Sequence, residues 1–296
     1  MAKFFCFDDG SLKECDNYPE SYGVGVIGLG EVESYDFYDK EEILKISSTK
    51  YTSYERRENF QYIVLNTPNS KIETGVTGKI VIYCNMRGVL LFGDNPNELS
   101  GVIGDFSDKL SAPDTAHFLA CFISALLSHD YIYMEGVEKD MGKVETEIIS
   151  SHTPNCPDKI NGYRRKVSVI KRYYEQLFEV CEVLCEEEWL SSACAEFQKI
   201  KEKVKRLRED SMYLRDYMSQ VREAYQQAID LSLNSVMKFL TAITLLFCPL
   251  TFLVGWYGMN FFMPETELSF GYAIPIVVAI AVVVVSIVLF KKKKWM

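Results

Sequence analysis

Small or polar side chains recur on one face of an otherwise apolar segment near the carboxyl end of the chain. Their spacing of three or four residues places them on the same side of a helix, and they are Asn234, Met237, Thr241, Thr244, Cys248, Thr251 and Gly255. Such a face is typical of the lining of a water-filled pore. The alternative interpretation is that small polar residues pack two membrane helices together. We favour a pore-lining face.

Two uncharged apolar runs contain and follow this face. No charged residue occurs from Phe239 to Trp256, and none occurs from Leu268 to Phe290. Each run is close to the roughly 20 residues that an apolar helix needs to cross a bilayer. A helix that is apolar all round is typical of a membrane span rather than of a surface helix. The sequence therefore predicts a first transmembrane helix over residues 237–257, a loop over residues 258–270 and a second transmembrane helix over residues 271–290.

The charges beside these runs predict their orientation. The loop carries Glu265 and Glu267 and no basic residue, and it can attract cations electrostatically. Basic residues lie at the other ends of both runs and form a collar, which would repel cations unless it is turned outward: Lys238, Lys291, Lys292, Lys293 and Lys294. The positive-inside rule then predicts a multi-pass protein of the cytoplasmic (inner) membrane, with both chain ends in the cytoplasm and a basic tail over residues 291–296.

The remaining chain is predicted to be cytosolic. Its 41 acidic against 32 basic residues give a formal net charge of -9. This balance argues against a nucleic-acid partner, because neutralising phosphates needs clustered cations. Residues 1–110 alternate β-prone runs with turn signals and predict an α/β domain. Its expected strands are Lys3–Phe7, Gly25–Leu29, Tyr62–Leu65, Ile80–Tyr83 and Val89–Phe92, with a short helix at Tyr38–Ile46.

Residues 111–236 predict a stalk of long helices. The expected helices run from Pro113 to about Ile149, from about Lys159 to Glu187, and from about Trp189 onward. The last one meets no Gly or Pro before Pro249, so it is expected to continue from the cytosol into the first apolar run. Its apolar residues follow coiled-coil spacing and must be covered by neighbouring helices or subunits: Phe197, Ile200, Val204, Leu207, Leu214, Met218, Val221, Tyr225 and Ala228.

Other constellations carry less weight. Gly23–Gly28 (GVGVIG) matches a dinucleotide-binding glycine pattern, but turn-like residues precede it and its glycines lie inside the apolar run, which favours a glycine-rich strand. The pairs His117/Cys121 and Cys181/Cys185 have helical spacing, yet zinc needs three or four ligands. No Ser/His/Asp arrangement is legible. We predict no enzyme, no catalytic residue, no cofactor and free cysteine thiols in a reducing compartment.

The residues between the two apolar runs resemble the CorA family of divalent-cation channels. Tyr257-Gly258-Met259-Asn260-Phe261, followed by Met263-Pro264-Glu265, is similar to the family signature Y-G-M-N-F and M-P-E. Further similarities are Asn234-Ser-Val-Met237-Lys238-Phe-Leu240-Thr241 to N-x-x-M-K-x-L-T, Pro249 with Thr251 to P-x-T, Gly271-Tyr272 to G-Y, and the terminal lysines with Trp295 to the family's tail. The close resemblance covers Tyr213 to Met296, and the upstream part is similar in layout only.

This resemblance implies a homopentameric funnel that conducts hydrated Mg²⁺ through a pore lined by the first transmembrane helix, with Co²⁺ and Ni²⁺ as further candidates. It implies a selectivity filter at Gly258, Met259 and Asn260. Mg²⁺ gives up its waters reluctantly, so amide and carbonyl oxygens that accept hydrogen bonds from those waters suit the filter, with Asn260 holding the hydrated ion. Met237 and Leu240 are candidates for a hydrophobic constriction, and Asn234 for a second polar ring.

The family also implies that cytosolic Mg²⁺ holds the pore closed, so Mg²⁺ is expected as both transported and regulatory ion. The sensing carboxylates are not mapped, and the candidates by residue type are Asp8, Asp9, Asp105, Asp108 and Asp130. Expected partners are further copies of the chain, membrane lipid and divalent cations. Two alternatives stay open: a zinc-transporting branch, in which the residue at Met259 usually differs, and a membrane-anchored ion sensor that does not conduct.

Overall fold

The structure is a computed structural model, which describes residues 2–8, 11–19, 22–34, 43, 45–46, 48–49, 51–57, 60–68, 77–85, 88–110, 114–150, 156–259 and 273–292. The chain divides into two compact units. The first comprises Met1–Thr146 and Cys156–Arg222, and the second comprises Glu147–Asn155 and Glu223–Met296.

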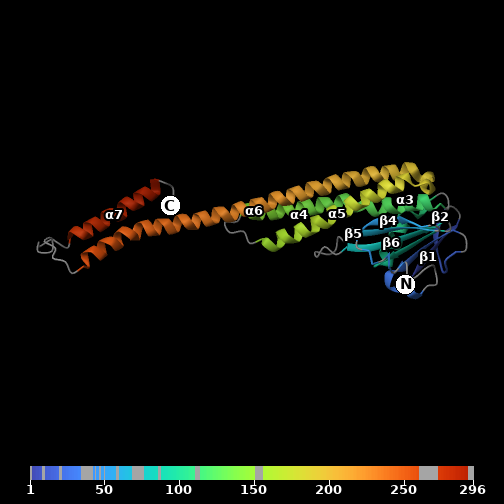
Figure 1. The fold of residues 1–296 in the computed structure, drawn as a ribbon, viewed down its shortest axis with the longest axis horizontal. Helices are drawn as coiled ribbons and strands as arrows, with labels where there is room; N and C mark the ends of the chain where they lie inside the picture. Colours follow the sequence, from blue (N-terminus) through green and yellow to red (C-terminus); the bar gives the residue numbers. More distant parts are fainter. Residues whose placement is uncertain are drawn as a thin grey trace. The chain divides into compact units, whose positions relative to one another are not determined.

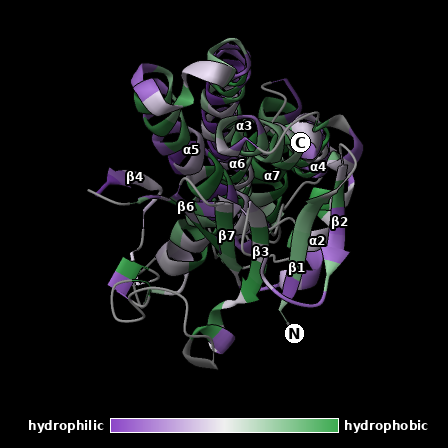
Figure 2. Cartoon of the chain, turned by 90° about the vertical axis from the view of Figure 1, so that its right-hand side faces the viewer, coloured by the Kyte–Doolittle hydropathy of each residue, from purple (hydrophilic) through white to green (hydrophobic). Residues whose placement is uncertain are grey.

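A mixed β-sheet forms the N-terminal part of the first unit. Within the described residues its strands are β1 (Lys3–Asp8), β2 (Ser11–Cys15), β3 (Gly23–Gly28), β4 (Ser53–Arg56), β5 (Gln61–Pro68), β6 (Thr77–Asn85) and β7 (Gly88–Gly93), in the order β2-β1-β3-β7-β6-β5-β4. β3 pairs with β7 in parallel, and the other neighbouring pairs are antiparallel. All of the predicted strands are confirmed, whereas β2 and β4 were not predicted. These are the edge strands, and Figure 2 shows hydrophilic residues on both.

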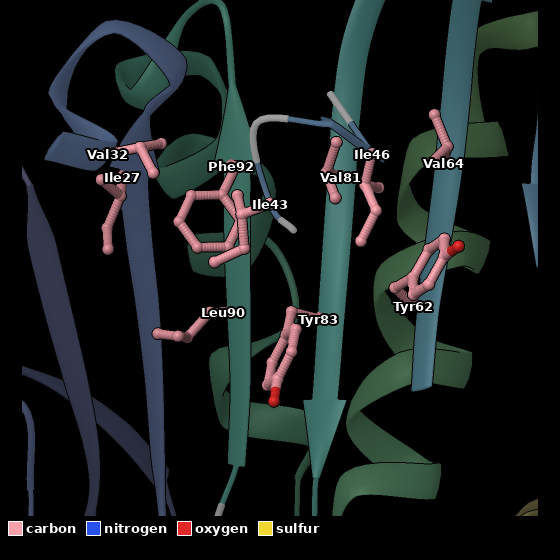
Figure 3. Packing of buried hydrophobic residues seen from close by; sticks show 10 residues of the cluster. All are labelled: Ile27, Val32, Ile43, Ile46, Tyr62, Val64, Val81, Tyr83, Leu90 and Phe92. Carbon is pink, nitrogen blue, oxygen red and sulfur yellow. The ribbon is translucent and has the colours of Figure 1, made fainter. Parts of the chain in front are cut away.

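A cluster of buried hydrophobic side chains covers one face of this sheet, as Figure 3 shows: Ile27, Val32, Ile43, Ile46, Tyr62, Val64, Val81, Tyr83, Leu90 and Phe92. Adjacent strands supply facing pairs, because Tyr62 is in register with Tyr83 and Val64 with Val81. Phe60 stacks on Tyr83 with ring centroids 4.6 Å apart. Burying one such side chain contributes about 1.5–3 kcal/mol. The cluster is therefore a main source of stability for the α/β part.

Strand β3 contains the glycine pattern that resembles a dinucleotide fingerprint. All of its residues are buried between β1 and β7. A Cβ on Gly25 would lie 2.7 Å from Leu90 Cδ2, and a Cβ on Gly23 would overlap the ring of Pro19. The glycines therefore let neighbouring side chains pack closely on the strand. They form no phosphate-binding turn, and the interpretation as a glycine-rich strand is confirmed.

Most of the described helices follow the sheet in the chain, whereas η1 (Leu29–Ser34) lies between β3 and β4 (Figure 1). The helices after the sheet are α2 (Pro96–Gly104), η2 (Ser107–Lys109), α3 (Thr115–Leu126), η3 (Leu127–His129), α4 (Asp130–Ser150), α5 (Pro157–Glu186), η4 (Glu188–Ala193), α6 (Cys194–Tyr257) and α7 (Ala273–Lys292). The second predicted helix is confirmed as α5, and α2 was not predicted. The short helix predicted at Tyr38–Ile46 lies largely outside the described residues.

The start of α3 differs from the prediction. Its first residue is Thr115, and Asp114 is the N-cap, whose carboxylate accepts a hydrogen bond from the Ala116 amide at 3.1 Å. The described helix thus begins two residues after Pro113, which itself lies outside the described residues. Asp is preferred at this position because its side chain satisfies an amide that has no partner within the helix.

The prediction of one helix reaching Ile149 is also wrong. The 3₁₀ turn Leu127–His129 separates α3 from α4. Ser128 Oγ and His129 Nδ1 lie 2.8 Å apart in this turn. Ser and Asp favour turns and helix starts because their side chains compete for backbone hydrogen bonds. Ser128 and Asp130 therefore interrupt the helix here, although the interruption contains no Gly or Pro.

Helices α4, α5 and the first part of α6 pack through stripes with coiled-coil spacing. On α6 the predicted seam is confirmed from Phe197 to Val221, where its members are buried, whereas Tyr225 and Ala228 are only half-buried. The seam contains one residue that was not predicted, Ser211, which is fully buried. The matching stripe on α4 is Met134, Val137, Met141 and Val144, and that on α5 includes Val167, Ile170, Tyr174, Leu177 and Cys181.

The second unit contains the rest of α6 and the whole of α7. Among the described residues, two helices are long and apolar enough to cross a membrane, and they end at Tyr257 and Lys292. Only 6% of the most apolar stretch of each is buried. The core helix of a soluble protein would be covered by its own chain, so the exposure favours two membrane spans. Helix α6 passes from the first unit into the second without a break, as predicted.

Candidate functional site

The predicted pore-lining residues all lie on α6 in the second unit. Thr241 is half-buried, and the remaining members are exposed in the single chain: Asn234, Met237, Leu240, Thr244, Cys248, Thr251 and Gly255. Met237 and Leu240, the candidates for the constriction, keep 59% and 55% of their surface exposed. A face of this kind needs another surface, water or lipid to cover it.

The threonines of this face bind their own helix. Thr241 Oγ1 donates to the Met237 carbonyl at 2.8 Å, and Thr244 Oγ1 donates to the Leu240 carbonyl at 2.9 Å. Thr251 makes the same type of bond further along α6, at 2.9 Å. Each hydroxyl has thus used its one hydrogen and keeps oxygen lone pairs as acceptors. The face can accept hydrogen bonds from water or from a hydrated ion without leaving a donor unsatisfied.

Pro249 lies inside α6 without ending it. Proline has no amide hydrogen, so the carbonyl four residues earlier, that of Leu245, loses its usual helical donor. In the apolar part of a membrane such a carbonyl needs another donor. Water on the polar face of α6 is a suitable one.

The end of α6 carries the first part of the predicted filter. The Gly258 amide donates to the Val254 carbonyl at 2.9 Å, and the Met259 amide donates to the Trp256 carbonyl at 3.4 Å. A Cβ on Gly258 would lie only 3.0 Å from the Val254 oxygen. Glycine therefore allows the chain to leave the helix tightly at this point. Met259 is 54% exposed.

Several predicted site residues lie outside the described residues. They are Asn260 of the filter, Glu265 and Glu267 of the loop, Lys293 and Lys294 of the basic collar, and the candidate sensor Asp9. The described part of the collar is Lys238 on α6 with Lys291 and Lys292 at the end of α7, and all three residues are exposed. Lys238 lies where the apolar part of α6 begins, and Lys291 and Lys292 lie where α7 ends, which are the places predicted for the collar.

Three of the candidate sensing carboxylates have described side chains, and these three do not form one metal-binding cluster. Asp105 and Asp108 follow α2, whereas Asp130 begins α4. Asp130 lies beside the buried Tyr174, and burial raises the pKa of the Asp130 carboxyl. Within the described part of the chain, no group of three His, Cys, Asp or Glu side chains is placed to hold a metal ion. A site shared between copies would draw its ligands from more than one chain.

His117, which the sequence pairs with Cys121, contacts Asp114 instead, and the sequence analysis did not predict this contact. His117 Nδ1 lies 2.6 Å from Asp114 Oδ2, and the Ser192 hydroxyl donates to the same oxygen at 2.7 Å. Partial burial acts to raise the pKa of Asp114, but the hydrogen bonds from His117, Ser192 and the Ala116 amide lower it overall. The arrangement joins α3 to η4. The cysteines form no disulfide within the described part of the chain.

The architecture is that of a two-span membrane protein with an α/β domain and long helices upstream of its spans. A family model described as "CorA-like Mg2+ transporter protein" matches residues 33–292. The chain therefore belongs to the CorA-like Mg²⁺ transporter family. This family consists of transporters, so the prediction that the chain is not an enzyme is confirmed.

Individual relatives agree with the family match. The chain is 27% identical over 253 residues to the cobalt/magnesium transport protein CorA of Thermotoga maritima, covering 81% of this chain and 71% of that relative. The complete structure of the CorA magnesium transporter from Methanocaldococcus jannaschii is similar with a TM-score of 0.81 at 16% identity, covering 100% of this chain and 99% of that one. The full-length CmaX protein is similar with a TM-score of 0.72 at 14% identity, covering 99% and 97%. These likenesses confirm the predicted fold of an α/β domain, long helices and two C-terminal apolar helices.

Proposed function

We propose that this protein is a homopentameric channel that passes hydrated Mg²⁺ across the cytoplasmic membrane. The observation that carries the proposal is the continuous helix α6, which ends at Gly258 and presents an exposed polar face along its apolar part. The Thermotoga maritima relative is named for cobalt and magnesium transport. Ions would move inward down their gradient, because an inside-negative potential contributes about 2.3 kcal/mol per charge per 100 mV.

The filter consists of Gly258, Met259 and Asn260, repeated in each copy around one axis. One chain supplies only one asparagine amide, so a ring of copies is needed to surround an ion. Amide and carbonyl oxygens accept hydrogen bonds from the waters of Mg²⁺, which avoids the high cost of removing them. Neutral oxygens also let the ion leave again, which conduction requires.

The pore continues along the exposed face of α6. The acceptor oxygens of Thr241, Thr244 and Thr251 line it, since their hydrogens are already bonded to the helix. Met237 and Leu240 form a hydrophobic constriction that closes by excluding water, and Asn234 adds a polar ring. Glu265 and Glu267 attract cations to the outer entrance, and the lysine collar is turned away from the pore axis.

Binding of Mg²⁺ to the cytosolic part closes the channel when internal Mg²⁺ is sufficient. The supporting feature is the acidic cytosolic body, which contributes most of the carboxylates behind the net charge of -9. Both chain ends lie in the cytoplasm in this proposal. Mg²⁺ is the transported and regulatory ion, and no further cofactor is required.

Flux into liposomes tests the proposal. The purified full-length chain is reconstituted with a Mg²⁺-sensitive dye inside, and Mg²⁺, Co²⁺, Ni²⁺ or Zn²⁺ is added outside under an inside-negative potential. We expect Mg²⁺ entry that slows when Mg²⁺ is preloaded inside. Entry of Zn²⁺ without Mg²⁺ would favour the zinc-transporting alternative. No flux from well-folded oligomers at low internal Mg²⁺ would favour the non-conducting sensor.

A further inference from the structure

We propose that one copy of this chain docks against the next through two oppositely charged flanks of α6 in the first unit. The acidic flank consists of Glu138, Glu145 and Asp210, and the basic flank consists of Arg208, Arg215 and Arg222. This inference rests on the proposed function only in taking the protein to be a ring of identical copies. It identifies the surfaces that join those copies in the cytosol.

The acidic flank lies between α4 and α6. The Tyr213 hydroxyl donates to Glu138 Oε1 at 3.1 Å, and the Tyr217 hydroxyl donates to Glu145 Oε2 at 2.6 Å. Burial and the nearby carboxylates of Glu209 and Glu138 raise the pKa of Asp210, which places Asp210 close to the same group of charges. The hydroxyls orient the two glutamates and leave their negative charges in place. Negative charge is therefore concentrated along this side of α6.

This flank is partly open to solvent, and Glu138 and Glu145 are half-buried. The Tyr213 and Tyr217 rings are stacked, with centroids 6.3 Å apart and 13° between their planes, and Tyr213 is 56% exposed. The first bond joins Glu138 of α4 to Tyr213 of α6, and the second joins the later residues Glu145 and Tyr217. The two helices therefore run in the same direction here. Glu138 and Glu145 are seven residues apart and therefore face the same side of α4.

The basic flank lies on the side of α6 that faces α5. Arg208, Arg215 and Arg222 follow Lys201 at intervals of seven residues, which places all four on one helix face. The Arg208 guanidinium lies 4.0 Å from the centroid of the Phe178 ring on α5. Lys201 lies 5.9 Å from the same ring, so this face of α6 is turned toward α5 and away from the acidic flank.

Counter-charges occur at one end of each flank. Lys201 pairs with Glu182 of α5 at 3.4 Å, and Arg206 lies near Tyr131 on the side facing α4. Beyond these ends the flanks keep opposite signs. Arg215 and Arg222 are exposed, and the carboxylate bonded to Arg215 is that of its neighbour Asp216, at 2.7 Å. An exposed pair of this kind is weak, so Arg215 remains able to bind another carboxylate.

The two flanks lie at the same position along the axis of α6. Arg215 lies between Tyr213 and Tyr217 in the sequence, and these tyrosines bind Glu138 and Glu145. Measured along the axis, Arg215 is therefore within one helical turn of both glutamates. If the copies are related by rotation about an axis that runs parallel to α6, the acidic flank of one copy and the basic flank of the next lie at the same position along that axis. Because the flanks lie on opposite sides of α6, each copy can offer one to each neighbour, which is the head-to-tail contact that closes a ring. Complementary charges then fix the orientation of the copies.

A charge exchange tests this docking on the full-length protein in detergent. Glu138→Lys with Glu145→Lys places like charges opposite the basic flank, and we expect at least a roughly tenfold lower oligomer fraction by native mass spectrometry. Arg215→Glu with Arg222→Glu should have the same effect. Combining all four substitutions should restore the oligomer. The matched control is Glu179→Lys with Glu186→Lys, an exposed pair with the same spacing on α5, which should leave the oligomer intact.

Two further variants separate docking from internal stability. Tyr213→Phe with Tyr217→Phe removes the bonds within the chain and keeps the charges, so the oligomer should persist. Glu145→Cys with Arg215→Cys, in a background with Cys194→Ser and Cys248→Ser, should give a ladder of cross-linked copies with a bifunctional thiol reagent, whereas either cysteine alone should not.

The inference is overturned if the four-substitution variant stays dissociated or if no ladder forms. Flux and oligomeric state of the unsubstituted protein are measured in parallel. Absent Mg²⁺ flux there counts against the proposed function. A conducting oligomer that is indifferent to the charge exchange counts against the docking surfaces alone.

Discussion

The two parts of helix α6 have opposite relations to their surroundings. Up to Val221 most of its apolar residues form a narrow buried stripe, and the other faces are mainly polar or charged, with Met212 and Tyr213 exposed. Further along, large apolar side chains are exposed on many sides, including Phe239 at 63%, Phe252 at 69% and Val254 at 74%. One continuous helix therefore meets two solvents. In water only a stripe can be apolar, whereas in a bilayer the whole surface can be.

This difference decides what each part of α6 depends on. The first part is stabilised by α4 and α5 of its own chain, so a substitution there should change the free energy of unfolding of one copy. In the proposed channel the second part relies on lipid and on other copies, so a substitution there should change conduction with little effect on the folding of the first unit. The predictions below test this contrast with variants in each part and in the helices that pack on α6.

The largest expected effect is on transport. Asn260→Ala should abolish Mg²⁺ flux in liposomes without dissociating the oligomer, because it removes the amide that holds the waters of the ion. Ser235→Ala, an exposed polar residue on the opposite side of α6 from the predicted pore face, is the control and should conduct normally. Retained flux in Asn260→Ala would show that the filter is elsewhere.

The next effect is on stability. Leu207 is fully buried in the seam, so Leu207→Ala should lower the free energy of unfolding of the first unit by about 2–5 kcal/mol. Leu231 is 70% exposed, and Leu231→Ala should change it by no more than about 0.5 kcal/mol. Denaturant unfolding of the full-length protein in detergent, followed by near-UV circular dichroism, measures both. Equal losses would remove the contrast between the two parts of α6.

A smaller effect is expected at the constriction. Met237→Ala or Leu240→Ala should raise the basal Mg²⁺ leak several-fold at high internal Mg²⁺, because a wider and less apolar ring excludes water less well. Phe239, which is 63% exposed on the opposite side of the same helix, supplies the control Phe239→Ala. If the leak is unchanged in both ring variants, the constriction is not at this level.

The sequence predicted the elements whose pattern is strong. The buried strands carry continuous apolar runs, and the seam of α6 has regular spacing, so both were found. Strands β2 and β4 were missed because they are short and polar at the edges of the sheet. The break between α3 and α4 was missed because Ser128 and Asp130 interrupt a helix through side-chain competition, which is a weaker signal than Gly or Pro.

The candidate site was predictable only in part. The motif around Gly258 and the spacing of the threonines on α6 identified a face and a helix end from the sequence. The bonds of Asp114 to His117 and Ser192 join residues from distant parts of the chain, and no local pattern reports such pairs. The charged flanks of α6 were not predicted for the same reason: Glu138 meets Tyr213 only after α4, α5 and α6 have packed.

The half-buried acid at the start of α4, Asp130, predicts a modest pH dependence. Burial raises the pKa of Asp130, so the native state holds this proton more tightly than the unfolded chain does. Its contribution to stability is complete below the unfolded pKa of about 3.9 and is lost as the pH rises through the higher native pKa. Asp130→Asn cannot ionise, so its stability relative to the unsubstituted protein should increase from acid toward neutral pH.

Thermal unfolding across this pH range measures the effect. Asp140 is the control, because a hydrogen bond from Lys143 lowers its pKa and the side chain is exposed. Asp140→Asn should show no such gain with rising pH. A constant difference between Asp130→Asn and the unsubstituted protein would mean that the native state does not favour the protonated acid.

The smallest effect concerns Ser211, the polar member of the seam. Its hydroxyl donates to the Arg208 carbonyl of the same helix at 2.6 Å, so the seam contains no unsatisfied donor there. Ser211→Ala should therefore cost at most about 0.5–1.5 kcal/mol, the net value of one hydrogen bond. Ser211→Leu restores the apolar pattern but adds volume to a packed position, which should cost about 1–3 kcal/mol. A Leu variant more stable than the Ala variant would show unfilled space at this level, and the stripe would then be less tightly closed by α4 and α5 than its burial indicates.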